Sequence, residues 1–331
     1  MILRTETKPV TSNMHSSKLP WTACAAVVVC LLVLTANAEA QSTKKAAPAT
    51  AALQTFATPQ QAADALIDAT EKFDVPALEQ LFGPGGRDLV FTGEPAGDRV
   101  LAAEFAKQAR EKEIVVVDPH NKNLAILAIG NENWPFAVPI VRKSGKWFFD
   151  SAAGRQELLY RRIGRNELDA IEICHGYVEA QHEYALQKRG DSGVNQYAQR
   201  IISTPGKQDG LAWQNADGTW DGPVGEGIAR IIEQGYTSRA EPYHGYFFKV
   251  LKGQGPAAPL GEMDFVVKGI MIGGFALVAA PAEYRVTGLK TFIVSHDGVV
   301  YQKDFGPQTL DVFKSMERFN PDKTWDPVKE Q

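Results

Sequence analysis

The histidines and Cys174 are the first residues to test for chemistry. His175 and His182 lie seven residues apart in a segment with helical periodicity. They therefore share a helix face but are two turns apart, whereas two metal ligands on one helix need a spacing of about three or four residues. Cys174 precedes His175 directly, and neighbours on a helix point about 100° apart. We therefore expect solvated histidines, and a cysteine that packs as a small apolar side chain rather than acting as a nucleophile.

Two groups of acidic residues could also carry chemistry. Paired carboxylates can share acid–base work, but the spacing of the first group fixes no distance between its members: Glu262, Asp264, Glu283 and Asp304. The second group lies in a glycine-rich segment without the register of an EF-hand loop, and we expect turns there rather than calcium: Asp209, Asn215, Asp217 and Asp221. No GxGxxG, Walker, GxSxG or HExxH motif occurs in the sequence. We expect no cofactor and no metal site, and we favour a non-catalytic role, although the absence of these motifs does not exclude catalysis.

Aromatic residues gather around residues 190–227, a segment rich in Gly, Asp and Asn with little periodicity. Aromatic side chains anchor interfaces and stack on sugars or peptides, although they also fill gaps between domains. A glycine-rich segment can adjust its backbone to a partner, so it is more typical of a binding surface than of a rigid catalytic site. The predicted binding residues are Trp213, Trp220, Tyr236, Tyr243, Tyr246 and Phe247.

The N-terminus has the pattern of a secretory signal peptide. Residues 21–34 are apolar except for Thr22, basic residues precede them, and the small-x-small exits Ala36-Asn37-Ala38 and Ala38-Glu39-Ala40 follow. The run is shorter than the roughly 20 residues of a membrane span. We expect cleavage within residues 1–40 to release a protein without a stable span into the periplasm or the exterior. Cys24 and Cys30 would leave with this segment, so no intramolecular disulfide is expected.

The bulk numbers limit the possible partners. Removing residues 1–40 takes away three basic and two acidic residues, which changes the formal charge from −4 to −5. A mildly acidic chain without a basic block does not favour nucleic acid or an anionic membrane surface as a partner. About 290 residues would remain, which is the length of two domains of ordinary size.

The order of periodic segments predicts an α+β protein. After a flexible leader at residues 41–55, residues 56–160 show helices and then short strands, with a Ser144-Gly145 hairpin turn. This order resembles the cone-shaped fold of nuclear transport factor 2, in which helices pack on a curved antiparallel sheet. Residues 161–331 begin with a long helix at about 164–189. After a short helix near 228–234, strands follow at 245–252, 265–271, 274–279, 291–295 and 299–303, with a His296-Asp297-Gly298 turn and a helix at 309–318.

Several phrases carry a family resemblance. Residues 245–251 (GYFFKVL), 273–284 (GGFALVAAPAEY) and 291–304 (TFIVSHDGVVYQKD) resemble the exported bacterial proteins grouped as domain of unknown function 2950. That family implies no particular activity. The long helix and the following strands also resemble the head of a type IV pilin or pseudopilin, which implies an antiparallel sheet packed on a helix. A whole domain stands between the signal segment and this head, unlike in pilins.

These observations favour a non-catalytic envelope protein that binds a small ligand or an envelope partner, or that organises the envelope. A hydrolase of cell-wall or peptide material, using clustered carboxylates or a metal, is the alternative from another class. A component of a pilus-like assembly is the third possibility.

Overall fold

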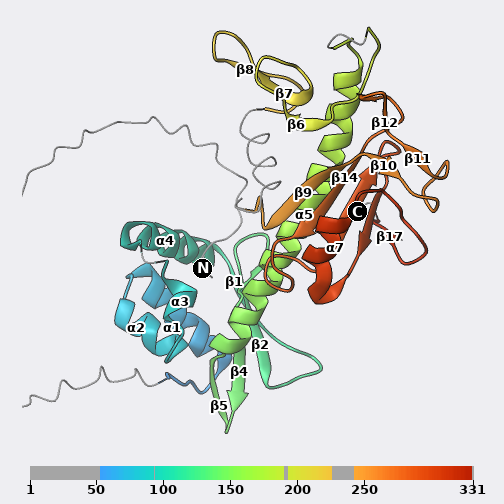
Figure 1. The fold of residues 1–331 in the computed structure, drawn as a ribbon. Coiled ribbons are helices and arrows are strands. Elements are labelled where there is room, and N and C mark those ends of the chain that lie inside the picture. Colours follow the sequence, from blue (N-terminus) through green and yellow to red (C-terminus); the bar gives the residue numbers. More distant parts are fainter. Residues whose placement is uncertain (1–52, 93, 190–192, 226–241, 330–331) are drawn as a thin grey trace, which may run out of the picture. The chain divides into compact units, whose positions relative to one another are not determined.

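The computed structural model describes residues 53–92, 94–189, 193–225 and 242–329 (Figure 1). The α+β class is confirmed: helices and antiparallel sheets make up two compact units, Met1–Glu157 and Leu158–Gln331. Within these residues, no helix combines the length and the apolar character needed to cross a membrane. The predicted signal peptide, most of the leader and the short helix near 228–234 lie outside the described residues.

The first unit packs helices on one antiparallel sheet. Its sheet has the strand order β1-β2-β4-β5, with β3 paired to β2. Phe82, Phe105, Phe136 and Phe149 meet between the helices and the sheet with ring centroids 5.3–6.3 Å apart. The elements are α1 (Pro59–Glu71), α2 (Val75–Phe82), α3 (Arg87–Val90), α4 (Pro95–Glu111), β1 (Glu113–Val117), β2 (Leu124–Ile129), β3 (Trp134–Pro135), β4 (Ile140–Lys143) and β5 (Lys146–Phe149).

Local sequence chemistry sets the ends of these elements. The Thr58 hydroxyl accepts from the Gln61 amide, and Gln61 reaches back to the cap backbone, which completes a capping box. Ser144 and Gly145 both have positive φ (51° and 80°), as a two-residue hairpin turn requires, so that prediction is confirmed.

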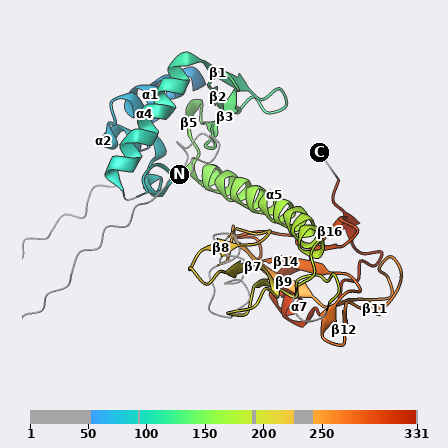
Figure 2. The ribbon, with the colours of Figure 1, turned by 90° about the horizontal axis from the view of Figure 1, so that it is seen from above.

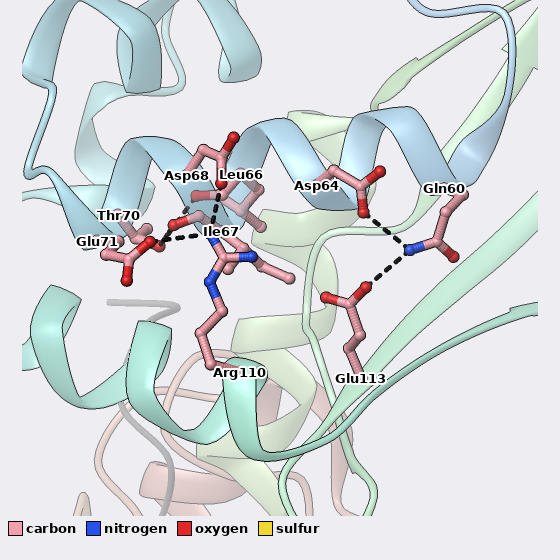
Figure 3. Close-up of polar contacts among 9 residues, drawn as sticks. All are labelled: Gln60, Asp64, Leu66, Ile67, Asp68, Thr70, Glu71, Arg110 and Glu113. Atoms are coloured by element: carbon pink, nitrogen blue, oxygen red, sulfur yellow. Dashed lines mark hydrogen bonds and ion pairs between the residues drawn. The ribbon is translucent and has the colours of Figure 1, made fainter.

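Polar contacts tie α1 to its neighbours in the first unit (Figure 3). Arg110 of α4 donates to Asp68 at 2.5 Å and to Glu71 at 2.8 Å. Gln60 donates to Asp64 and, at 2.8 Å, to Glu113 of β1. These groups are exposed, so they contribute little beside the aromatic core.

Helix α5 (Ser151–Ala185) begins 13 residues before the predicted start at Gly164. Asp150 caps it by accepting from the amides of Ala152 and Ala153, each at 3.1 Å. Gly164 does not interrupt the helix, because one glycine in a long, packed helix costs only about 1 kcal/mol. The predicted range of about 164–189 therefore starts too late and extends four residues past the end at Ala185.

The second unit is built on a five-stranded antiparallel sheet of order β17-β16-β15-β14-β9. Helix α5 covers one face and α7 (Thr309–Ser315) the other (Figures 1 and 2). The central strands β14 and β15 are buried at every residue, which explains their apolar and small composition. The strands are β9 (Tyr246–Leu251), β14 (Ala276–Pro281), β15 (Thr291–Ser295), β16 (Val300–Lys303) and β17 (Asp326–Pro327).

Smaller elements complete the second unit, and two of them correct the sequence predictions. Residues 190–227 were expected to be irregular, yet they contain β6 (Arg200–Ile202), β7 (Gly210–Gln214) and β8 (Trp220–Asp221) in one sheet. The expected strand at 265–271 is instead a tight hairpin of β12 (Val266–Val267) and β13 (Ile270–Met271), because Lys268 and Gly269 both adopt positive φ. Among the described residues, this unit also contains the hairpin of β10 (Gly253–Gln254) with β11 (Met263–Asp264) and the 3-10 helix η2 (Gly306–Gln308).

Two glycines of α5 provide a matched test of packing. A Cβ on Gly154 would lie 2.6 Å from Val138 Cγ2, whereas one on Gly164 would meet no atom within 4 Å. We expect Gly154→Ala to lower the free energy of unfolding by about 1–3 kcal/mol through overpacking. Gly164→Ala should raise it by about 0.5–1 kcal/mol, because alanine restricts the unfolded chain. Urea unfolding followed by circular dichroism measures both, and equal effects at the two sites would contradict the close contact with Val138.

Candidate functional site

A cavity of about 440 Å³ lies in the second unit, between α5 and the small β6-β7-β8 sheet. Helix α5 contributes one wall, β6 and β7 contribute Ile201 and Leu211, and residues 223–225 with Tyr243 and His244 complete the lining. The α5 residues are Asp169, Glu172, Ile173, Gly176, Tyr177, Glu179, Ala180 and Glu183.

The cavity wall on α5 follows from helix periodicity. Asp169, Gly176 and Glu183 are seven residues apart, so they lie within about 40° of one another around the helix axis. Gly176 stands at the middle of this face, and a Cβ there would meet no atom within 4 Å. The glycine therefore leaves the centre of the wall open where any other residue would project into the cavity.

Gln181 holds α5 to the strand that forms the opposite side of the cavity. The side chain is fully buried, and its amide group donates to the Ala198 carbonyl at 2.8 Å and accepts from the Ala198 amide at 2.8 Å. It also donates to the Tyr177 hydroxyl at 2.9 Å. Because Ala198 leads directly into β6, this clamp fixes the small sheet relative to the helix.

Four carboxylates, Asp169, Glu172, Glu179 and Glu183, are among the described residues that line the cavity, and the three glutamates are exposed to solvent. Within the described parts of the chain, the last three form no ion pair, while Asp169 contacts Nδ1 of His244. Desolvation by burial raises the pKa of Tyr243, and the charges of Asp169 and Glu172 raise it further. The negative charges of the α5 face thus add to the effect of burial on the pKa of this phenol.

The predicted aromatic binding residues are distributed over different parts of the second unit. Trp213 is 5 % exposed, and Tyr246 is fully buried with its hydroxyl donating to the Lys290 carbonyl at 2.9 Å. Phe247 packs near Phe313 on the α7 side, with ring centroids 6.4 Å apart. Trp220 is half-buried on β8, and Tyr236 lies outside the described residues.

Of the five aromatics that the structure describes, Tyr243 lines the cavity. Its ring meets the His244 ring edge to face, with centroids 4.3 Å apart. A binding role for the whole set stays a prediction. The α5 residues that line the cavity were not among the residues predicted from the sequence. A glycine at the centre of acidic residues that repeat at helical spacing is the pattern that could have identified them.

The other candidates for chemistry are held in structural roles. Arg318 donates to Asp264 at 2.6 Å and lies 4.0 Å from Glu262, whereas Asp304 accepts from the Gly306 amide. In the glycine-rich segment where turns were expected, the carboxylates accept from nearby backbone amides: Asp209 from Thr204, Asp217 from Thr219 and Asp221 from Gly222. No group of three or more potential ligands that could hold a metal ion occurs among the residues searched, which are the described ones.

His296-Asp297-Gly298 forms the expected turn between β15 and β16. Asp297 accepts from the Val299 amide at 3.2 Å, and Gly298 has a φ of 77°. Gly298 adopts a positive φ and Asp297 does not, so this turn differs from a type I′ turn, in which both central residues would do so. The turn chemistry of the Asp-Gly pair nevertheless accounts for these residues without a catalytic role.

The comparisons with known proteins identify a family. The model of the family described as "Protein of unknown function (DUF2950)" matches residues 53–328. The chain belongs to this family. The match of this DUF2950 protein covers both units, and the family resemblance seen in the C-terminal phrases is thereby confirmed. No curated protein and no solved structure matches the chain, so the likenesses to nuclear transport factor 2 and to a pilin head stay predictions.

Cys174 offers a test of burial on the core side of α5. The side chain is fully buried, and desolvation raises the pKa of its thiol from 9.0 to about 12. The pKa of this thiol is therefore higher in the folded protein than in the unfolded chain. Below pH 9 the thiol is neutral in both states, and burying it adds its full contribution to the free energy of unfolding. As the pH rises from 9 towards 12, the thiol ionises in the unfolded chain alone, so this contribution falls. At pH 8, a Cys24→Ser/Cys30→Ser protein should react with a disulfide reagent about 1,000-fold faster in urea than when folded. Equal rates in the two states would show that Cys174 is accessible.

Proposed function

We propose that this DUF2950 protein is exported and binds a ligand in the α5 cavity without catalysing a reaction. The observation that carries the proposal is the cavity itself, whose volume of about 440 Å³ lies in the usual range for small-molecule sites. Its lining combines apolar side chains with a few polar groups on one wall, which is the usual composition of such sites.

The types of side chain in the lining also indicate which reactions the cavity could catalyse. Among the residues of the lining that the structure describes, there is no serine, threonine, cysteine or lysine side chain that could act as a nucleophile. The His244–Asp169 contact does favour a second candidate, hydrolysis, because a carboxylate that orients a histidine is one arrangement for a general base. Such a reaction would use water activated by His244. His244→Asn, compared with the parent protein on peptidoglycan and peptide substrates, tests this candidate, and absence of turnover by both proteins would remove it.

Export is tested by the N-terminus of the native protein. If residues 1–40 act as a signal peptide, intact-mass analysis of protein from the periplasmic fraction should give a chain that starts at Glu39 or Gln41. A native chain that keeps residues 21–34 would instead be anchored in the membrane by them.

Ligand binding is tested by filling the cavity. Gly176→Leu should place an isobutyl group in the open centre of the wall, whereas Gly164→Leu adds the same group on the same helix outside the cavity. We expect saturation-transfer NMR with neutral, cationic and anionic fragments to detect binding to the parent protein and to Gly164→Leu. Gly176→Leu should lose that binding by about tenfold or more while remaining folded, because the ligand and the side chain compete for one space.

The opposite results are equally clear. Fragments that bind Gly176→Leu as tightly as they bind Gly164→Leu would place binding elsewhere. If no fragment of any charge binds the parent protein, the cavity is not a ligand site.

A further inference from the structure

We propose that strand β1 of the first unit pairs with β1 of a second copy of this chain, so that two sheets join across a two-fold axis. The proposal concerns the first unit and is independent of the cavity and its ligand. It rests on the backbone groups at the edge of β1, on the side chains that this strand exposes, and on a sequence that is complementary to itself when the strand is reversed.

The first sheet has two edges, and one of them is occupied. At the β5 edge, the amide of Trp147 donates to the Phe56 carbonyl at 2.9 Å, and the amide of Phe56 donates to the Trp147 carbonyl at 2.8 Å. At the other edge, β1 pairs with β2 alone among the residues that the structure describes. An edge of this kind is a template for another strand, unless lysine, proline or a covering segment protects it.

The ladder with β2 determines which backbone groups of β1 face outward. The amide of Gly130 donates to the Lys112 carbonyl at 2.8 Å, and the amide of Asp118 donates to the Leu124 carbonyl at 2.9 Å. Both pairs continue the register of β1 with β2. Because hydrogen bonding alternates along an antiparallel ladder, even-numbered residues of β1 bond to β2 and odd-numbered ones face away from it. The outward N–H and C=O groups belong to Glu113, Val115 and Val117.

The side chains that β1 exposes are apolar. Ile114 is 40 % exposed, Val116 51 % and Val117 38 %. Ile114 lies opposite Ala128 of β2, and Val116 lies opposite Ile126. Directly opposite residues share one face of a sheet, so this apolar surface continues from the edge onto the neighbouring strand. The sequence of β1, EIVVV, contains neither the lysine nor the proline that would protect such an edge.

The strand is complementary to its own reverse. In an antiparallel pair centred on Val115, that residue lies opposite its own copy, and Ile114 lies opposite Val116 of the second copy. Lys112 then lies opposite Asp118 of the second copy, at both ends of the pair. Apolar pairs and pairs of opposite charge both stabilise adjacent strands. The side chains of β1 therefore match those of a reversed β1.

The charged residues select this register among those that the backbone allows. A pair centred on Ile114 would set Lys112 opposite Val116, and one centred on Val116 would set Asp118 opposite Ile114. The centre at Val115 avoids both mismatches and also sets Glu113 opposite Val117 rather than opposite another carboxylate. Within its own chain, Glu113 accepts from Gln60 of α1 at 2.8 Å (Figure 3).

The symmetry of such a contact limits it to two copies. Each β1 uses the same residues towards the other, so the two-fold axis leaves no β1 edge for a third chain. The β5 edge is already paired with Phe56. The first unit therefore supports a closed dimer rather than an open fibre.

Sedimentation velocity of the purified protein tests the inference. We expect a monomer–dimer equilibrium within about 1–100 μM, as for small interfaces. Ile114→Lys/Val116→Lys sets lysines opposite one another and should weaken dimerisation by about tenfold or more. Val100→Lys/Leu186→Lys adds the same charge at exposed apolar positions outside β1 and should leave dimerisation unchanged. Circular dichroism checks that both variants are folded.

An exchange of charges tests the register. Lys112→Glu places two acidic groups opposite each other at both ends of the pair, and Asp118→Lys places two basic groups there. Each variant alone should therefore dimerise about fivefold or more weakly than the parent. An equimolar mixture restores opposite charges at both ends of a heterodimer and should recover the parental dimerisation. Effects confined to single chains would give no recovery on mixing, which would overturn the register centred on Val115.

The remaining outcomes also decide the question. Dimers that persist in Ile114→Lys/Val116→Lys, or that are lost equally in Val100→Lys/Leu186→Lys, would show that β1 is not the contact. A protein that is monomeric at every concentration overturns the proposal, and hydrogen exchange then identifies what lies at the edge. Protected β1 amides would show that another segment of the same chain covers them, and freely exchanging amides would show an open edge.

Discussion

The clamp between the Gln181 side chain and the Ala198 backbone is the interaction on which the cavity depends. The buried Gln181 amide both donates to and accepts from Ala198, so it fixes the orientation of that backbone segment as well as its distance from α5. Loss of either partner would leave a buried polar group without a hydrogen bond, which is costly in apolar surroundings. Through Ala198 it positions β6, and through β6 the neighbouring strand β7. The apolar side chains of the small sheet, including Ile201 and Leu211, belong to the main core of the second unit, and the amide of Tyr197 adds a hydrogen bond to the Met271 carbonyl at 2.8 Å. The open space beside α5 is therefore associated with buried hydrogen bonds that hold the small sheet in one position relative to the helix.

Within the second unit, helix α5 contacts the hydrophobic core on one side and borders the cavity on another. Cys174, Tyr177 and Tyr184 form its core side, where burial raises the pKa of each ionisable group and keeps it neutral. The cavity side carries carboxylates and a glycine instead. The two sides overlap at Tyr177, which is buried in the core and also lines the cavity.

Much of the fold follows from local sequence rules. The Thr58 capping box, the Ser144-Gly145 turn and the strands at 246–251 and 291–295 are set by short-range chemistry, which one sequence displays. The start of α5 was not predictable in this way, because packing of its first turns overrides the weak preference of Gly164. The strands within residues 190–227 are two to five residues long, and they are defined by hydrogen bonds to one another rather than by a periodic sequence pattern. The candidate site was harder still. Trp213 and Tyr246 look like interface aromatics in sequence, yet they are core residues, and only coordinates reveal which face of α5 borders empty space.

The alanines of β14 have an effect beyond the sheet. Ala279 pairs with Phe248 and lies fully buried on the same side as Tyr246, towards α5. Its size sets how closely the helix approaches the strands, and the helix is also a wall of the cavity. The dimensions of the cavity are thus determined partly by residues of the sheet interior that do not line it. A change in side-chain volume at Ala279 would therefore alter the cavity without any exchange of the residues in its lining.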